Sequence, residues 1–203
     1  MKYILGIIVA LIVIGAIAGL IHLYRVSRKN KKEMAQYTGK SAEVTNSLGK
    51  VLVVYYSLTG RTKGIAERIA AKTGADLFEI KTKEQYPGGV KLYTTSKKEI
   101  KTKQYPAVES FPDTAAYDVI FVGAPAWWFT VAPPVFTVLE KVDFLGKKVV
   151  PFSTQESVVG TFFEDFAAAA KNARILQHES FNNMGKKYDE QLDAKIADWI
   201  NGL

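Results

Sequence analysis

The sequence contains no cysteine among its 203 residues, and it has only two histidines. The absence of cysteine excludes disulfide bonds, catalysis by a thiolate and metal sites that depend on thiolates. His22 and His178 stand far apart and neither has a neighbouring cluster of ligand residues, so the sequence predicts neither a metal site nor a serine-histidine triad. Any redox chemistry therefore has to come from a bound cofactor.

Most of the chain is also nearly neutral in net charge. The overall charge is +7, but residues 1–40 hold 7 basic and 1 acidic residue, whereas residues 41–203 hold 20 basic and 19 acidic ones. A domain that binds a polyanion would carry the basic excess itself. We therefore expect no nucleic-acid partner, and the basic excess must be explained by the segment in which it lies.

Next to this basic excess lies an apolar stretch without charged residues, from Tyr3 to Tyr24. As a helix it would rise about 33 Å, which is enough to span the hydrocarbon core of a bilayer. Only Lys2 precedes it, whereas a basic cluster follows it, formed by Arg25, Arg28, Lys29, Lys31 and Lys32. The positive-inside bias then places the N-terminus outside and the remaining chain in the cytoplasm. We expect a membrane anchor over residues 1–25 and a basic juxtamembrane linker over residues 26–49.

Two other features of the apolar stretch leave alternatives open. Ala16-Ile17-Ala18 resembles the cleavage site of a secretory signal peptide, but the weak basic start and the downstream basic cluster favour an uncleaved anchor. Gly15 and Gly19 form a Gly-x-x-x-Gly pair that would let two such helices approach in a weak homodimer. Chance explains this pair equally well in a stretch so rich in small residues.

The strongest local pattern is Val51 to Thr62, which begins with an unbroken apolar and aromatic run typical of a buried parallel strand. A loop with three hydroxyls and a glycine follows it, and a helix with apolar residues at helical spacing starts near Arg61. The free N–H groups and dipole of such a helix favour an anion such as a phosphate beyond the strand. The alternative is a capped helix with nothing bound.

Further strands and helices alternate along the rest of the chain. The pattern predicts strands at 75–81, 117–123, 147–154 and 174–182, and helices at 61–72, 90–101, 135–141, 161–171 and 189–203. Together with the strand at Val51, they predict one α/β domain over residues 50–203, with a parallel sheet covered on both sides. Ligands of such sheets bind beyond the carboxyl ends of the strands.

Aromatic residues gather where the strand at 117–123 ends. Ala124 to Thr130 contains Trp127, Trp128 and Phe129, and we expect this segment to be an irregular loop. Consecutive side chains point apart, so at least one tryptophan should be available to a planar ligand, although a core plug is the alternative.

Three stretches in this order resemble the flavodoxins, in particular single-domain flavodoxin-like proteins with a Pro-x-Trp-Trp loop. They are Ser57-Leu58-Thr59-Gly60-Arg61-Thr62, Pro125-Ala126-Trp127-Trp128, and Lys147 to Thr154 followed by Gly160 to Asp165. The resemblance implies a doubly wound five-stranded parallel sheet of order 2-1-3-4-5 with bound FMN. It assigns the FMN phosphate to the first stretch and the flavin ring to the other two, with contacts from Phe129, Thr154, Gln155, Glu156 and Gly160.

The chain departs from the family pattern at two positions. Gln155 to Val159 replaces a glycine-rich run, so this loop must meet the flavin differently or not at all, and Phe129 stands where a glycine is usual. If the loop folds over the flavin, Glu156 would disfavour reduction by charge repulsion; the alternative is that it points to solvent or caps the next helix.

The resemblance favours an electron carrier between cytoplasmic reductases and membrane-associated acceptors, because no second nucleotide loop or acid-base pair is evident. Its electron donor and acceptor would be redox proteins or small molecules. An NAD(P)H-dependent flavin or quinone reductase is the first alternative. A non-catalytic flavodoxin-like binding module is the second.

Overall fold

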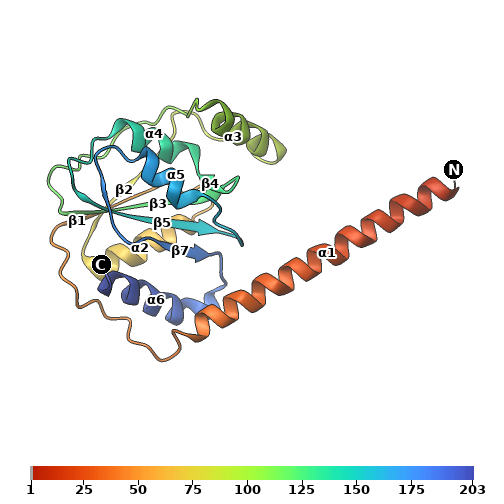
Figure 1. Cartoon of the computed structure of the whole chain (residues 1–203), viewed down its shortest axis with the longest axis horizontal. Helices are drawn as coiled ribbons and strands as arrows, with labels where there is room; N and C mark the ends of the chain where they lie inside the picture. The colour runs from red at the N-terminus through yellow and green to blue at the C-terminus, as the bar shows by residue number, and fades with distance from the viewer. Residues whose placement is uncertain (1) are drawn as a thin grey trace.

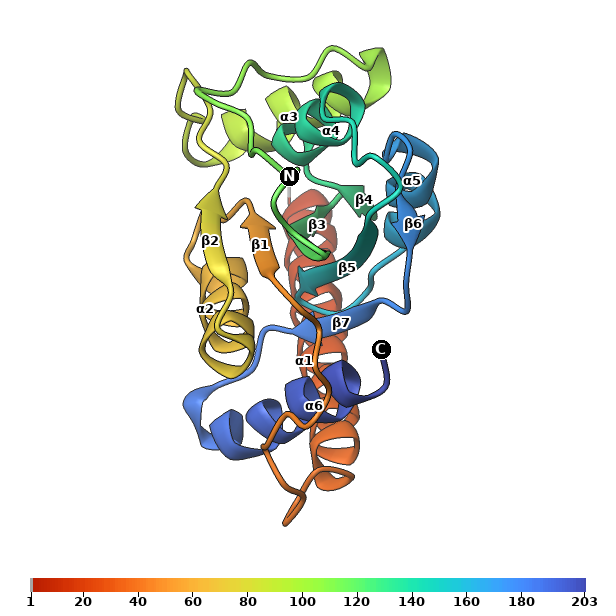
Figure 2. The same cartoon turned by 90° about the vertical axis from the view of Figure 1, so that its left-hand side faces the viewer.

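The computed structural model describes residues 2–203, and Met1 lies outside the described residues. A parallel β-sheet with helices on both faces forms its folded domain (Figures 1 and 2). The strands of this sheet are β1 (Val51–Tyr55), β2 (Asp76–Glu79), β3 (Val119–Trp127), β5 (Lys148–Gln155), β6 (Arg174–Ile175) and β7 (Glu179–Asn182). Their spatial order is β2-β1-β3-β5, with β6 and β7 both pairing with β5 on its other side. The predicted α/β fold and the strand order 2-1-3-4-5 are confirmed.

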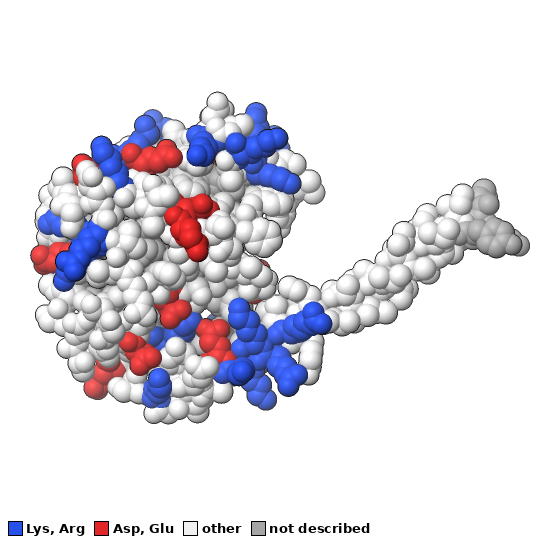
Figure 3. Space-filling model, viewed as in Figure 1, with Lys and Arg blue, Asp and Glu red and all other residues white. Residues whose placement is uncertain are grey.

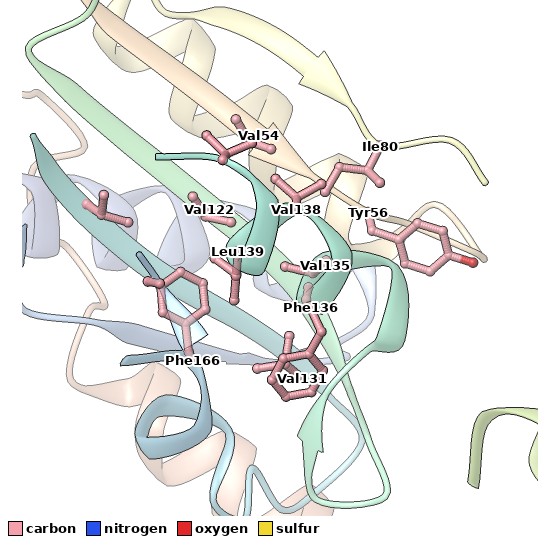
Figure 4. Packing of buried hydrophobic residues seen from close by; sticks show 14 of the residues in the cluster. Val54, Tyr56, Ile80, Val122, Val131, Val135, Phe136, Val138, Leu139 and Phe166 are labelled. Atoms are coloured by element: carbon pink, nitrogen blue, oxygen red, sulfur yellow. The ribbon is translucent and has the colours of Figure 1, made fainter. Parts of the chain in front are cut away.

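Helices cover both faces of the sheet. They are α2 (Arg61–Thr73), α3 (Val90–Thr102), α4 (Pro133–Lys141), α5 (Phe162–Ala169) and α6 (Asp189–Asn201), and a short 3₁₀ turn, η1 (Lys186–Tyr188), precedes α6. On one face, α2 and α6 pack against alternate residues of β1 such as Val53. On the other face, Val135 and Phe166 from α4 and α5 pack with Val54 (Figure 4). Because both faces of β1 are buried, its sequence is apolar at every position.

Two details of the sheet differ from the expectation. The strand expected at 117–123 continues as β3 to Trp127 and then pairs antiparallel with a two-residue strand, β4 (Thr130–Val131). The expected irregular segment 124–130 is therefore wrong. The strand expected at 174–182 is split into β6 and β7, and its register against β5 advances by one residue across the break. The break lies opposite Pro151, which has no N–H to donate.

A single long helix, α1 (Lys2–Ala35), precedes the domain and projects away from it (Figure 1). Its most apolar window has a mean hydropathy of 2.7, is 0% buried and is apolar enough to be a membrane span or a signal sequence. Its last turns differ from this exposed part, because Asn30 and Met34 are buried against the domain. The helix thus joins an exposed apolar stretch to a docked end.

The expected linker at 26–49 is also in contact with the domain. Its first part continues α1 to Ala35, and its second part crosses α6 as an extended segment. Val44 and Leu48 pack on the core, and the backbone N–H of Thr45 donates to Asn201 Oδ1 at 2.7 Å. These contacts attach the basic segment to the domain (Figure 2).

Candidate functional site

A cavity of about 490 Å³ lies beyond the carboxyl ends of β1, β3 and β5. Its volume falls within the range of small-molecule and cofactor sites in proteins. Most of the predicted site residues line it, namely Ser57, Leu58, Thr59, Arg61, Thr62, Pro125, Ala126, Trp127, Trp128, Phe129, Thr154, Gln155 and Glu156. The three stretches that are separate in the sequence therefore meet at one place, at the edge of the sheet where ligands of this fold class bind.

The loop between β1 and α2 is arranged to receive an anion. Gly60 has φ 84°, which a glycine adopts without strain, and no side chain caps the N-terminus of α2. Ser57 Oγ is buried without a hydrogen-bond partner in the described chain. Thr62 and Thr154 share a buried hydrogen bond of 2.8 Å between their hydroxyls. The alternative of a side chain that caps this helix is thus wrong in this structure, and the loop presents free donors to the cavity.

The two tryptophans of the middle loop lie in different environments. Trp127 packs edge-on against Tyr56 and Tyr86, with ring centroids 5.8 and 5.2 Å away. Trp128 is 40% exposed and donates from Nε1 to Ser96 Oγ at 3.1 Å. The first is a half-buried wall of the cavity, whereas the second is more open to a ligand.

The end of this middle loop is tied to the loop after β5. Phe129 is 61% exposed, and its carbonyl accepts a 2.8 Å hydrogen bond from the backbone N–H of Thr161. Gly160 has φ 67°, and a Cβ there would collide with the Phe129 carbonyl. Gly160 therefore serves as a close-approach position rather than as a cavity wall, and Gly60 likewise acts through its backbone.

The non-glycine loop after β5 is held by polar contacts. Gln155 is buried between Ser153, whose Oγ donates to Gln155 Oε1 at 2.9 Å, and Asn182, which accepts from Gln155 Nε2 at 3.1 Å. Glu156 accepts a 2.7 Å hydrogen bond from Asn183 Nδ2. The alternative that Glu156 caps α5 is wrong, because no side chain caps that helix.

One wall of the cavity was not expected from the sequence. It is formed by Leu92, Tyr93 and Ser96 of α3, and Ser157, Val158 and Asn183 are further lining residues that were not predicted. The four lysines of α3 indicate a helix face exposed to solvent, which is what its outer surface is. They gave no indication that the other face of this helix would line a site. The available signal was Tyr93, an aromatic residue among polar neighbours.

Burial sets the ionisation of the groups beneath the middle loop. Burial raises the pKa of Tyr56 and of Tyr86 well above the usual range, so both phenols stay protonated. Burial also raises the pKa of Glu99, although the Tyr86 hydroxyl that donates to its carboxylate at 2.7 Å partly opposes this. The two protonated phenols form a neutral aromatic support for Trp127.

A family model described as Flavodoxin matches residues 50–202. The chain belongs to the flavodoxin family. Among solved structures, a flavoprotein of Lactobacillus acidophilus NCFM in complex with FMN is 26% identical with a TM-score of 0.60, covering 64% of this chain and 92% of its own. A protein of Bacteroides eggerthii DSM 20697 described as a flavoprotein is 27% identical with a TM-score of 0.63, covering 75% and 96%. A search of curated proteins found no match.

Proposed function

We propose that this flavodoxin domain binds FMN and transfers electrons. The observation that carries the proposal is the buried Ser57 Oγ, unpaired beside the uncapped N-terminus of α2. A buried hydroxyl without a partner is costly, and a phosphate group would supply the acceptor that it lacks. The solved flavoprotein with FMN supports the same ligand. In this assignment Ser57, Thr59 and Thr62, with the backbone N–H groups of 58–62, hold the phosphate.

The other two loops would hold the ring system of FMN. Trp128 and Phe129 offer exposed aromatic surface to the cavity, and Glu156 and Val158 also line it. FMN supplies one- and two-electron redox chemistry when bound, and the protein positions it and sets the charge around it. The residues present therefore fit FMN in both its anionic and its planar part.

The function that we favour is an electron carrier between cytoplasmic reductases and membrane-associated acceptors. Support comes from the sequence, which has no recognisable second nucleotide loop and no cysteine. The competing function is an NAD(P)H-dependent flavin or quinone reductase. Anaerobic mixing of the FMN-loaded protein with NADH or NADPH separates them: a carrier stays oxidised without a reductase, whereas rapid bleaching of the flavin would establish the reductase.

We further propose that α1 anchors the protein in the membrane, with the domain on the cytoplasmic side. Its exposed apolar length and the basic cluster that follows support this orientation. The mature protein should keep its N-terminal residues by intact-mass analysis and resist extraction by alkaline carbonate. Cleavage after Ala18 would instead identify a signal peptide. The pairing of two helices through Gly15 and Gly19 stays a prediction, which crosslinking in the membrane would test.

The binding of FMN is tested with the full chain in detergent and with riboflavin as the matched ligand, because riboflavin lacks the phosphate. We expect Thr62→Val to weaken FMN binding about 10-fold, as expected for the loss of a hydrogen bond to a charged group, and to leave riboflavin binding unchanged. Thr73→Val, at the other end of α2, is the control. Absence of FMN binding would overturn the proposal and favour a non-catalytic binding module.

A further inference from the structure

The cavity opens on the side of the domain from which α1 departs. The strands β3, β5 and β7 point toward that side, and the apolar part of α1 extends away from it (Figure 1). The docked end of α1 reaches the cavity loop directly, since Lys29 Nζ lies 3.5 Å from the Ser157 carbonyl. Asn182 donates to Asn30 at 2.9 Å and accepts from Gln155, which lines the cavity. The anchor and the cavity loop are therefore held next to each other.

An apolar rim surrounds the mouth of the cavity. Five large apolar side chains that line the cavity are exposed, namely Leu58 (43%), Tyr93 (61%), Trp128 (40%), Phe129 (61%) and Val158 (54%). Val90, which is 79% exposed, does not line the cavity but lies at the start of α3, one helical turn before Tyr93. A bound ring would cover the inner members but would leave Val90 outside. Grouped apolar side chains of this kind mark a surface that contacts a partner.

Basic residues flank this rim on two sides. On α3 they are Lys91, Lys97, Lys98 and Lys101, and on the docked end of α1 they are Arg25, Arg28, Lys29, Lys31 and Lys32. Figure 3 shows Lys and Arg gathered over both helices, with a hollow between them. Lys97 lies 4.8 Å from the Trp128 ring centroid, which links the basic and apolar groups. Within residues 2–203, none of these nine side chains forms an ion pair.

We propose that this face, the apolar rim with its two basic flanks, docks on the anionic headgroup surface of the membrane that α1 enters. Lysine and arginine are attracted to anionic lipid, and exposed aromatic and aliphatic side chains insert at the interface. The N-terminal direction of α1 fixes which side of the domain the bilayer occupies, and that side is the one with the mouth of the cavity. The cavity therefore opens toward the bilayer.

The consequence concerns the redox partner of the proposed FMN site. A site that faces the headgroups is accessible to a partner held in or on the membrane, and is shielded from large soluble proteins while docked. The proposal rests on the proposed anchoring by α1, but it adds an orientation of the domain relative to the bilayer. In this orientation α3 makes the second contact with the membrane.

The absence of cysteine makes the test direct, because a single introduced cysteine carries the only label. The full chain with Val90→Cys, labelled with an environment-sensitive fluorophore, is reconstituted in vesicles of phosphatidylcholine alone or with phosphatidylglycerol. We expect a blue shift and quenching by brominated lipid in the anionic vesicles. Leu145→Cys is the control. Leu145 is 61% exposed and lies just before β5, at the amino ends of the strands and thus away from the cavity at their carboxyl ends.

A charge variant separates docking from anchoring. Lys97→Gln, Lys98→Gln and Lys101→Gln together should abolish most of the blue shift at position 90, while the protein stays resistant to alkaline carbonate. A label at position 90 that stays in water in an anchored, FMN-binding protein would overturn the docking proposal alone. A blue shift that depends on protein concentration rather than on anionic lipid would indicate a second copy of the chain and would also overturn it.

Discussion

At the scale of single residues, Ser57 gives the sharpest prediction. Its Oγ is buried and unpaired, so Ser57→Ala removes a polar group that the ligand-free protein cannot satisfy. We expect the free energy of unfolding without FMN to rise by about 1 kcal/mol, while the affinity for FMN falls. Denaturant unfolding and FMN titration measure the two effects, with the exposed Ser110→Ala as control. A loss of stability in the ligand-free variant would show that Ser57 has a structural partner instead.

Glu156 is the residue that would tune the bound cofactor. Its carboxylate lines the cavity and is oriented by Asn183 Nδ2 at 2.7 Å. A negative charge there disfavours the addition of electrons to FMN, so Glu156→Gln should raise the midpoint potential of the bound flavin by tens of millivolts at low salt. The glutamine keeps an oxygen for Asn183.

The control for this prediction is Glu164→Gln, which removes the same charge from an exposed position in the first turn of α5. Redox titration of both variants should show a shift for Glu156 alone. Equal potentials in all three proteins would mean that Glu156 lies too far from the ring system to act on it.

At the scale of elements, local sequence predicted the site where it is formed by consecutive residues. The loop from Ser57 to Thr62 follows directly from a buried strand and a glycine. By contrast, β3 runs past Gly123, where the sequence predicted its end, and includes Pro125. At Ala124 and Pro125 this strand pairs with β5 only, before Ala126 and Trp127 pair with β4, so Pro125 lies where a missing N–H costs little. Where a strand ends thus depends on the strands that pair with it, and the sequence of a single segment does not reveal those partners.

The α3 wall was missed for the same reason. Ser96 lines the cavity, and a hydrogen bond from Trp128 Nε1 holds α3 against the middle loop at this position. The two residues are 32 positions apart. Likewise, Asn30 and Asn182 are 152 positions apart, so no local pattern could indicate their contact. Local patterns therefore predict strands, helices and adjacent loop residues, whereas contacts between distant elements require the fold.

The packing of α3 leads to a prediction on pH. Burial raises the pKa of Glu99 in the folded state above its usual value of 4.5. The folded protein then binds a proton more tightly than the unfolded chain, so stability is lost as the pH rises from the unfolded pKa through the raised folded pKa. Glu99→Gln keeps an acceptor for Tyr86 and removes this loss. We expect the variant to match the parent at acidic pH and to exceed it above the folded pKa.

Thermal unfolding between acidic and neutral pH measures this difference in stability. Glu84→Gln, at an exposed position before Tyr86, is the matched control and should leave the pH dependence of the parent unchanged. A Glu99→Gln protein that is less stable than the parent at neutral pH would contradict the prediction. It would show that the charged carboxylate stabilises α3 through Tyr86.

At the scale of the whole molecule, the domain extends beyond the segment that matches the family model. That match begins at residue 50, yet α1 contributes to a buried ion pair. Lys195 is only 4% exposed, and its Nζ lies 2.6 Å from Glu33 Oε1 of α1 and 3.2 Å from Glu179 Oε1 of β7. Met34 is 1% exposed and Asn30 is hydrogen-bonded to Asn182. The docked end of α1 is thus part of the folded unit, whether the apolar stretch before it anchors the protein or is removed.

Two truncations test this boundary. A protein that begins at Arg25 keeps the docked end of α1, and we expect it to unfold with the same free energy as the domain of the full chain. A protein that begins at Gln36 loses the burial of Met34 and the contacts of Asn30 and Glu33, which should cost roughly 3 kcal/mol. It should also bind FMN more weakly, because Asn182, which accepts a hydrogen bond from Gln155 at the cavity, then loses its other partner, Asn30.

The point variant Met34→Ala in the protein that begins at Arg25 is the matched control for chain length. It should reproduce a large part of the stability loss, since it removes only the buried side chain, and it should leave FMN binding nearly unchanged because the contact between Asn30 and Asn182 persists. Equal stability and equal FMN affinity in both truncated proteins would contradict the prediction. The folded unit would then begin after α1, and the proposed orientation of the cavity toward the bilayer would lose its rigid connection.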